Sequence, residues 1–326
     1  MNNPPGPLRP DGLRGTVAVI LSWNGLPFVQ QNLPSWTGQR QPFVRMIIVD
    51  NGSRDGTADW LTRHAAADMV RLPKNMGFAA GANDGLRRAL TCVGGDAVAL
   101  INNDVNLEPG WNGALRAALF AADDVGACAG CLLQARDPGR IDNAGIVWTR
   151  PGWAENARHG EPADSGAPSD IEGVSAGAAI YRPEYLREVG GFDERLFAYQ
   201  EDVDLSLRGR RAGWRYRYVP AARGIHAGHG SNRKYPLGGS WADYYNARNR
   251  LYVFIKNGPG SGGMGSRSAV LRAMVRAAGR SLIERRGGAV WAGLLHGLIW
   301  WPLALRARTA STPSLFSAPP AGLGDV

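Results

Sequence analysis

The sequence predicts an α/β protein with a mostly parallel central sheet and helices on the faces of that sheet. Short apolar runs alternate with stretches of helical spacing, which is the order of strand–helix–strand units. Several of the apolar runs stop abruptly at polar residues, as buried strands do at the edge of a sheet. The length of 326 residues allows one large domain and an appendage.

The first hundred residues supply most of the expected parallel sheet. Four apolar runs are the expected strands, at 16–24, 43–50, 69–72 and 97–101. Segments of helical spacing lie between them, at 28–36, 57–64 and 75–90. Ligands of open α/β sheets bind beyond the carboxyl ends of the strands. Asn24, Asp50 and Asp104 follow three of these strands, so we expect them to meet at a binding site.

A simple turn is the alternative interpretation of Asn102-Asn103-Asp104. Asn and Asp favour turns because their side chains bond to the nearby backbone. Taken alone, this stretch favours the turn. Asn24 and Asp50 also stand at strand ends, and the three positions together favour a site for a metal or a phosphate-bearing ligand.

The second half of the chain predicts further strands and two helices. The expected strands are 125–133, 174–182 and 213–220, with a sheet extension at 142–153. The expected helices are 183–189 and a segment through Leu205 and Leu207. Residues 154–172 are polar and rich in Gly, Pro and Ser, which predicts a mobile loop.

The three cysteines do not predict a metal or redox centre. Cys128 and Cys131 have the C-x-x-C spacing of such sites. They lie inside a continuous small and apolar run, and no second pair completes a zinc site. We expect them in a buried strand, and the sparse cysteine content fits a reducing cytoplasm.

A glycine-rich stretch at 75–85 precedes one of the helices. Its glycines let the backbone approach a ligand, and a helix start offers free N–H groups to an anion. The spacing is neither G-x-G-x-x-G nor G-x-x-x-x-G-K-[ST], so dinucleotide and P-loop sites are excluded. On its own, a helix start with packing glycines is the simpler interpretation.

An acidic cluster at 201–204 forms a second chemical centre. Acidic residues favour the first turn of a helix, so capping is the simplest explanation. Capping does not explain the aromatic and amide neighbours Phe197, Tyr199 and Gln200. Such neighbours suit a sugar-binding cleft in which a carboxylate accepts a proton.

Four motifs occur in order along the chain: 17–24, I-V-D-N-G-S-R-D-G-T at 48–57, N-x-G-F-A-x-G-x-N at 75–83 and L-x-N-x-D at 100–104. Together they resemble family 2 glycosyltransferases of the GT-A fold, in the rhamnosyltransferase-like branch. The resemblance implies a Rossmann-like sheet. It also implies inverting transfer of a sugar from a nucleotide-diphosphate sugar to a hydroxyl of a glycan or lipid-linked acceptor. Rhamnose is suggested by the branch alone.

The resemblance also implies roles for individual residues. Asp202 would be the catalytic base, and Asp204 would support its helix. Asp104 and His226 would hold Mg²⁺ or Mn²⁺, although Asn102 and Asn103 stand where the family often has further carboxylates. The nucleotide-sugar contacts would be Leu21, Ser22, Trp23, Asn24, Asp50, Asn51, Asn75, Gly77, Phe78, Asn83, Asn103 and Asp104. The acceptor contacts would be Tyr199, Gln200, Glu201 and Arg248, with Asn249 beside them.

The basic charge of the chain is concentrated at its C-terminal end. Residues 251–326 carry Lys256 and eight arginines against Glu284 and Asp325, which is a net +7 of the formal +9. Arg272, Arg276 and Arg280 mark the polar face of an amphipathic helix. The apolar segment 291–305 is short for a membrane span.

Two interpretations of this C-terminal region stay open. One is an interfacial segment on an anionic membrane surface. The other is a helical hairpin docked on the catalytic domain. The expected organisation is a flexible arm at 1–15, a GT-A domain at 16–256, a Gly-rich linker at 257–266, a membrane-associating helical extension at 267–308 and a disordered tail at 309–326. The expected location is the cytoplasm, peripheral on the inner face of the cell membrane.

Two other functions are weighed against glycosyl transfer. A sugar-nucleotide nucleotidyltransferase usually carries a Gly-rich loop with Arg or Lys after its first strand, and Ser22-Trp-Asn-Gly-Leu26 lacks one. A nucleic-acid-binding protein would use the basic tail. The tail arginines alternate with aliphatic residues instead of stacking aromatics. We therefore expect no nucleic-acid partner.

Overall fold

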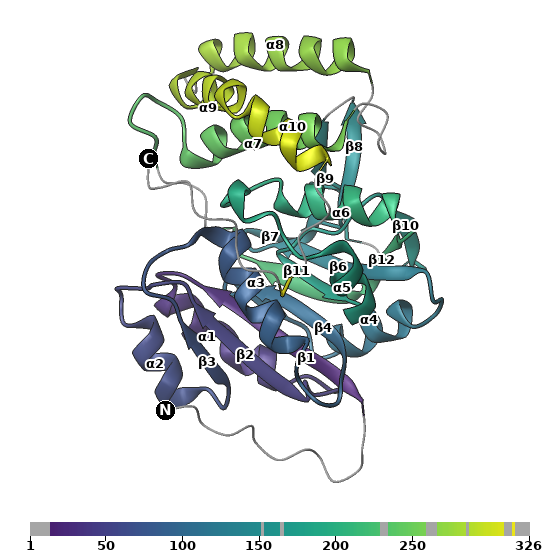
Figure 1. The fold of residues 1–326 in the computed structure, drawn as a ribbon. Coiled ribbons are helices and arrows are strands. Elements are labelled where there is room, and N and C mark those ends of the chain that lie inside the picture. Colours follow the sequence, from purple (N-terminus) through teal and green to yellow (C-terminus); the bar gives the residue numbers. More distant parts are fainter. Residues whose placement is uncertain are drawn as a thin grey trace.

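A mixed sheet of ten strands forms the centre of the protein in a computed structural model (Figure 1). The model describes residues 14–150, 153–163, 166–228, 234–258, 266–284, 287–309 and 315–316. Nearly all of the expected arm, most of the Gly-rich linker and tail, and His229 therefore lie outside the described residues.

The strand order is β10-β12-β6-β11-β4-β1-β2-β3, with β5 beside β12 and β7 beside β6. The first strands are β1 (Gly15–Ser22), β2 (Arg45–Asp50), β3 (Asp68–Arg71), β4 (Gly95–Asn102) and β5 (Val105–Leu107). The later strands are β6 (Val125–Gln134), β7 (Asp137–Asn143), β10 (Ser169–Ile171), β11 (Ala178–Tyr181) and β12 (Arg215–His226). Strands β3, β2, β1 and β4 run parallel, and β12 runs parallel to β6. The predicted mostly parallel α/β class is confirmed.

Alternation along β1 explains why the sheet is covered on both faces. Val17, Val19 and Leu21 enter one apolar core with helices α3 (Gly77–Ala89) and α5 (Pro183–Val189). Ala18 and Ile20 enter the opposite core with α1 (Leu26–Thr37), α2 (Thr57–His64) and α4 (Trp111–Leu119). Successive strand residues point to opposite faces, so a fully apolar strand such as β1 serves both cores.

The expected loop at 154–172 is wrong at both of its ends. A hairpin of β8 (Ile146–Arg150) and β9 (Trp153–Asn156) takes up its start. Strand β10 takes up its end and pairs antiparallel with β12. Strand β12 itself continues six residues past the predicted end at 220, to His226. Cys128 and Cys131 are free thiols buried in β6, as predicted.

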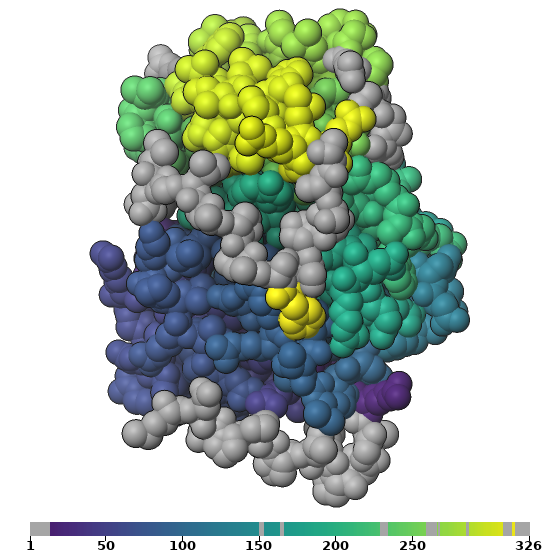
Figure 2. Space-filling model, in the orientation of Figure 1, coloured from purple at the N-terminus to yellow at the C-terminus, as the bar shows by residue number. Residues whose placement is uncertain are grey.

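Four C-terminal helices form a layer of their own above the sheet domain (Figures 1 and 2). They are α7 (Trp241–Asn257), α8 (Arg267–Ile283), α9 (Gly287–Ile299) and α10 (Trp301–Thr309). Helix α9 packs closely on α7 because it presents glycines there: a Cβ at Gly293 would lie 2.4 Å from the carbonyl oxygen of Tyr244. Among the described residues no single helix is long and apolar enough to cross a membrane. Helices α9 and α10 taken together have the length and apolar composition of a membrane span, but the chain bends by 55° between them.

The tail returns to the main domain at Leu315. This side chain is 3 % exposed and belongs to the core that contains α3. Arg87 donates to its carbonyl oxygen over 2.7 Å. The yellow atoms of residues 315–316 lie against blue and teal surface in Figure 2. Leu315 is thus packed in a core, whereas the sequence predicted a disordered tail at 309–326.

Candidate active site

The carboxyl ends of β1, β2 and β4 are joined to one another by hydrogen bonds, as their polar tips predicted. Asn103 donates through its side chain to the Ser22 hydroxyl over 2.9 Å and through its backbone to the Leu21 carbonyl. Asn51 donates through its backbone to the Ser22 carbonyl over 2.8 Å. The half-buried Trp23 follows directly, and the Asn24 side chain accepts from the backbone N–H of Arg54.

Asp50 offers an oxygen for a ligand at this edge. The residue is 3 % exposed, and its Oδ2 accepts from the backbone N–H of Ser53. Its Oδ1 is buried and takes no hydrogen bond from the described residues. A buried acceptor of this kind is costly unless a ligand or water donates to it.

Asn51 and Asn75 shape the glycine-rich stretch. The Asn51 side chain donates to the Gly77 carbonyl and accepts from the backbone N–H of Met76. Asn75 accepts from the backbone N–H of Gly77. Gly77 has a φ of 84°, and a Cβ there would lie 2.5 Å from the Phe197 ring. The glycine is therefore required by the close approach of the Phe197 segment.

Phe78 and Asn83 have packing roles in the structure. The Phe78 ring meets Phe192 edge-on, with centroids 5.9 Å apart. Asn83 is 3 % exposed and holds the backbone of Phe192 through both of its side-chain polar atoms. These contacts fasten α3 to the following turn. They do not support the expectation that Asn83 binds the nucleotide sugar.

Asp104 and His226 come together although 122 residues separate them. His226 is the last residue of β12, and its Nε2 lies 3.5 Å from Asp104 Oδ1. Its Nδ1 lies 2.7 Å from Oδ2 of Asp142 on β7. Burial disfavours the imidazolium, but the bonds to Asp104 and Asp142 prevail and raise the pKa of His226 to about 10. A cation bound beside Asp104 would take the place of this proton, because a histidine ligates a metal only as the neutral imidazole.

The donor set at this place fits a divalent cation that shares its coordination with a diphosphate. No cluster of three or more His, Cys, Asp or Glu side chains suited to a metal occurs in the described part of the chain. Mg²⁺ is commonly held by one or two carboxylates together with substrate phosphates. Asp142 would fix the orientation of the His226 ring, as the partners of metal-bound histidines do.

Asp202 stands at the start of α6 (Glu201–Arg211) with part of its surface exposed. Its Oδ2 accepts from the backbone N–H of Ala176 over 3.3 Å, and its Oδ1 accepts from that of Val203. Burial raises the pKa of the Asp202 carboxyl, against the opposing effect of these bonds and of the Ser175 side chain. A carboxylate with a raised pKa is a better proton acceptor than an ordinary one.

Residues 176 and 177 link the strand end near Asp104 to the acidic cluster at 201–204. Ala176 donates to Asp202, and the next residue, Gly177, accepts from the backbone N–H of Asn102 over 2.8 Å. Asn102 is two positions from Asp104. The structure therefore brings the carboxylates of Asp104 and Asp202 to the same edge of the sheet.

Glu201 is buried beside Asp202. Burial raises the pKa of Glu201 well above its ordinary value, and the charge of Asp202 acts in the same direction. Its Oε2 takes no hydrogen bond from the described residues. This carboxyl is suited to stay protonated and to donate a hydrogen bond.

Helix α7 holds the strained loop that leads into α6. Phe197, Tyr199 and Gln200 all have positive φ, which is uncommon for residues other than glycine. The fully buried Asn249 donates to the carbonyl oxygens of Leu196, Ala198 and Tyr199 at 2.7–2.8 Å. The loop conformation is thus fixed by one amide from α7.

Arg248 also supports this loop from inside. It is 5 % exposed, donates to the Leu196 carbonyl over 2.9 Å, and lies over the Trp300 ring at 4.3 Å. Desolvation lowers the pKa of its guanidinium. These contacts do not support the expectation that Arg248 touches the acceptor.

Asp204 supports its helix through a buried ion network, as the sequence predicted. It accepts from Arg208 on α6 and from Lys256 on α7, both over 2.8 Å. Lys256 also reaches Asp193, which Arg195 contacts as well. Despite burial, Lys256 and Arg208 hold the pKa of Asp204 below the ordinary range, and Lys256 and Arg195 do so for Asp193. The network joins α6 to α7.

Sequence reasoning missed Asp142, Ser175 and the supporting role of Asn249. Asp142 lies in a strand whose place beside β6 depends on long-range pairing, and no local motif marks it. Asn249 was named only beside the expected acceptor contacts, but its role depends on a loop about fifty residues earlier.

The chain belongs to glycosyl transferase family 2, whose family model matches residues 17–190, more than half of the chain. It is therefore a glycosyltransferase. Asp202 and His226 lie beyond the matched residues. The nucleotidyltransferase and nucleic-acid-binding alternatives gain no support from this match.

Two relatives carry the name of rhamnosyltransferases. The N-acetylglucosaminyl-diphospho-decaprenol L-rhamnosyltransferase of Mycobacterium tuberculosis is 29 % identical over 232 residues, which is 64 % of this chain and 74 % of the relative. Rhamnosyltransferase WbbL of Escherichia coli is 51 % identical over 47 residues, which is 14 % of this chain and 18 % of the relative.

Two solved structures share the fold. The mannosyltransferase PcManGT from Pyrobaculum calidifontis, in complex with GDP-Man and Mn²⁺, has a TM-score of 0.54 over 90 % of this chain and 88 % of its own, at 16 % identity. GalNAc-T7 with UDP, GalNAc and Mn²⁺ has a TM-score of 0.59 over 76 % of this chain and 48 % of its own, at 14 % identity. At these identities the likeness concerns the fold alone.

Proposed function

We propose that this glycosyltransferase transfers a sugar, of the rhamnose type, from a nucleotide-diphosphate sugar to a lipid-linked glycan acceptor, with inversion at the anomeric carbon and with Asp202 as the base. The observation that carries the mechanism is the place of Asp202. Its carboxylate has a raised pKa, is partly exposed, and is tied through Ala176 and Gly177 to the strand end that bears Asp104. The lipid-linked acceptor and the sugar are suggested by the name of the mycobacterial relative.

The nucleotide would lie over the ends of β1 and β2. The buried Oδ1 of Asp50 would accept a hydrogen bond from an N–H of the base, and its lack of a donor among the described residues supports this role. The backbone at Leu21, Ser22 and Asn24 would line the nucleoside. Asn51, Asn75 and Gly77 would shape this wall of the pocket through the contacts they make with each other.

Asp104 and His226 would hold Mg²⁺ or Mn²⁺ against the diphosphate. The cation would neutralise the charge that develops on the leaving diphosphate. Asp142 would orient the His226 ring, and Asn103 would keep the Asp104 turn against Ser22.

Asp202 would take the proton of the acceptor hydroxyl as the oxygen attacks the anomeric carbon. The bond from that carbon to the diphosphate breaks as the new bond to oxygen forms, so one displacement inverts the configuration. Tyr199, Gln200 and a protonated Glu201 would border the acceptor sugar.

The C-terminal layer would bring the enzyme to an anionic membrane on the cytoplasmic side. Its helices expose large apolar side chains, among them Leu271, Ile283, Trp291, Leu295 and Ile299. The exposed arginines of α8 would meet anionic head groups.

Binding of donor candidates tests the nucleotide and metal sites together. Wild type is titrated by calorimetry with a panel of nucleotide-diphosphate sugars in Mn²⁺ and in excess EDTA. We expect one donor to bind at least tenfold more tightly with the metal present. Asp50→Ala should weaken the binding of this donor at least tenfold, since a lost hydrogen bond to a charged group is worth about 1.5–3 kcal/mol. Equal affinity of Asp50→Ala and wild type for every donor would contradict the site.

A further inference from the structure

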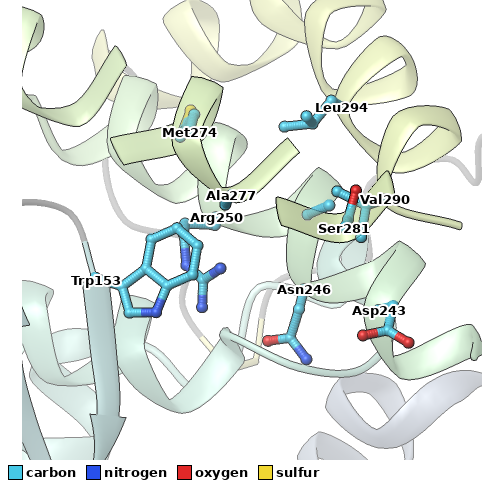
Figure 3. Close-up of a pocket in the computed structure, with 10 residues that line it drawn as sticks. Trp153, Asp243, Asn246, Arg250, Met274, Ala277, Ser281, Val290 and Leu294 are labelled. Carbon is cyan, nitrogen blue, oxygen red and sulfur yellow. The ribbon is translucent and has the colours of Figure 1, made fainter. Parts of the chain in front are cut away.

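A pocket of about 260 Å³ lies between the C-terminal helices and the β8–β9 hairpin, apart from the sheet edge described above (Figure 3). Its two walls differ in character. Helix α7 contributes Asp243, Asn246 and Arg250, whereas α8 and α9 contribute Met274, Ala277, Ser281, Val290 and Leu294. One wall is therefore polar, with one cation and one carboxylate, and the other is apolar except for Ser281.

The polar wall is in direct contact with the loop that leads to Asp202. The Asn246 side chain accepts a hydrogen bond from Gln200 Nε2 over 3.0 Å, and Gln200 is two residues before Asp202. The Arg250 guanidinium lies 3.6 Å from the centroid of the Trp153 ring, which fixes its place in the pocket. The carboxylate of Asp243 is engaged by Ser240 at the start of α7.

The apolar wall leads toward the exposed apolar surface of the same helices. Leu271 and Val275 on α8 and Trp291 and Leu295 on α9 are between 49 and 64 % exposed. A molecule that enters between α8 and α9 thus meets apolar side chains outside, Met274 and Leu294 inside, and Arg250 and Asn246 at the end nearest the active site.

We propose that this pocket binds a prenyl diphosphate, the part of a lipid-linked acceptor where the chain joins its head group. The first prenyl units would lie against Met274, Val290 and Leu294, and the diphosphate would face Arg250. The attached sugar would then extend past Asn246 and Gln200 toward Asp202. This assignment rests on the proposed function only for its choice of a lipid-linked acceptor.

Binding of a prenyl diphosphate tests the pocket without any sugar transfer. The probe is decaprenyl diphosphate with a diazirine near its head group, in detergent micelles with the full chain. We expect light-induced labelling of peptides from α8 and α9. Ala277→Phe, which fills the pocket, and Leu294→Gln, which makes its apolar wall polar, should each weaken binding at least tenfold. Ala121→Phe makes the same substitution at an exposed position of the sheet domain, away from the pocket, and should bind as wild type does.

The head group is tested separately with Arg250→Gln. We expect this variant to bind the diphosphate at least tenfold more weakly and to bind the uncharged prenol as wild type does. The proposal is overturned if Ala277→Phe and Leu294→Gln, melting at the wild-type temperature, keep wild-type affinity. It is also overturned if the label maps away from α8 and α9.

Transfer assays separate this proposal from the proposed function. With a decaprenyl-linked sugar, Ala277→Phe should raise KM at least tenfold. With a simple glycoside of the same sugar, which carries neither diphosphate nor prenyl chain, its rate should equal that of wild type. If wild type glycosylates neither acceptor but the probe labels the pocket as expected, the proposed function fails and the prenyl site stands. The prenyl site is contradicted if Ala277→Phe lowers the rate of transfer to the two acceptors by the same factor.

Discussion

Asp202 differs from the other acids of its cluster in what surrounds its carboxylate. Asp204 is enclosed by Arg208 and Lys256, which hold its pKa below the ordinary range. Glu201 has no such cation, and burial raises its pKa well above the ordinary value. Asp202 lies between these extremes, with backbone donors on both oxygens and part of its surface exposed. These environments suit the three acids to the roles of base, hydrogen-bond donor and structural residue in the proposed mechanism.

The pH dependence of the rate follows from the raised pKa of Asp202. The base must be ionised, so kcat/KM should fall as pH drops through an apparent pKa above the ordinary aspartate value of 3.8. Glu201 titrates beside it, so the measured value belongs to the pair. Ser175→Ala removes a bond that favours the ionised form and should move this acidic limb to higher pH. A limb that stays in place or moves down would contradict the assignment.

At the scale of elements, the active site depends on α7 as much as on the sheet. The sheet supplies Asp50, Asp104 and His226 from strand ends. Helix α7 supplies the donor groups that hold the loop before Asp202, and it carries the polar wall of the prenyl pocket.

Removing the Asn249 amide should displace Asp202 without changing the binding of the nucleotide sugar. In Asn249→Ala the carbonyl groups of Leu196, Ala198 and Tyr199 lose their shared donor, and the strained loop can relax. We expect kcat to fall about a hundredfold, the cost of a displacement of about 1 Å in a reacting group. The Kd of the nucleotide sugar should not change. Asn156→Ala, at an exposed hydrogen bond of β9, serves as the control. A changed donor Kd with an unchanged kcat would contradict the positioning role.

The elements that could be predicted from the sequence are those with local signals. Helices α2 and α5 begin and end at the residues expected from the sequence, and the strands of the parallel half were predicted from their apolar runs. Strand β8 lies inside the expected sheet extension at 142–153, but it pairs with β9 in a separate hairpin. Most of β9 and strand β10 were missed because their pairing partners, and not their composition, make them strands. Motifs pointed to Asp104 and Asp202 as candidate site residues, whereas no motif marks Asp142, whose place depends on strand pairing. Asn83 was assigned by motif to the ligand, but burial turned its amide toward Phe192.

At the scale of the whole molecule, charge and exposed apolar surface are gathered in the C-terminal layer. Residues 251–326 hold +7 of the formal charge of +9, and α8 carries three exposed arginines next to exposed Leu271 and Val275. Helix α7 of this layer is joined through Lys256 and Asp204 to α6, the helix that carries Asp202. Recruitment to a membrane and delivery of a lipid acceptor would therefore use the same face.

Vesicle binding tests this arrangement. Arg272, Arg276 and Arg280 changed together to Gln should weaken binding to vesicles rich in anionic lipid by about a hundredfold, because each contributes about 1 kcal/mol near such a surface. The same change at three exposed arginines of the sheet domain, Arg63, Arg88 and Arg140, is the matched control and should have little effect. Sedimentation with vesicles measures both. Equal losses from the two sets would contradict a membrane face on α8–α10.

The most direct test of the central claim is single-turnover transfer by Asp202→Asn. The amide keeps the shape of the side chain but cannot accept the proton of the acceptor hydroxyl. We expect the variant to bind the nucleotide-diphosphate sugar with wild-type Kd and to lose at least a thousandfold in the rate of transfer, within the range that general bases contribute. Transfer at the wild-type rate, with the donor bound equally well, would show that Asp202 is not the base.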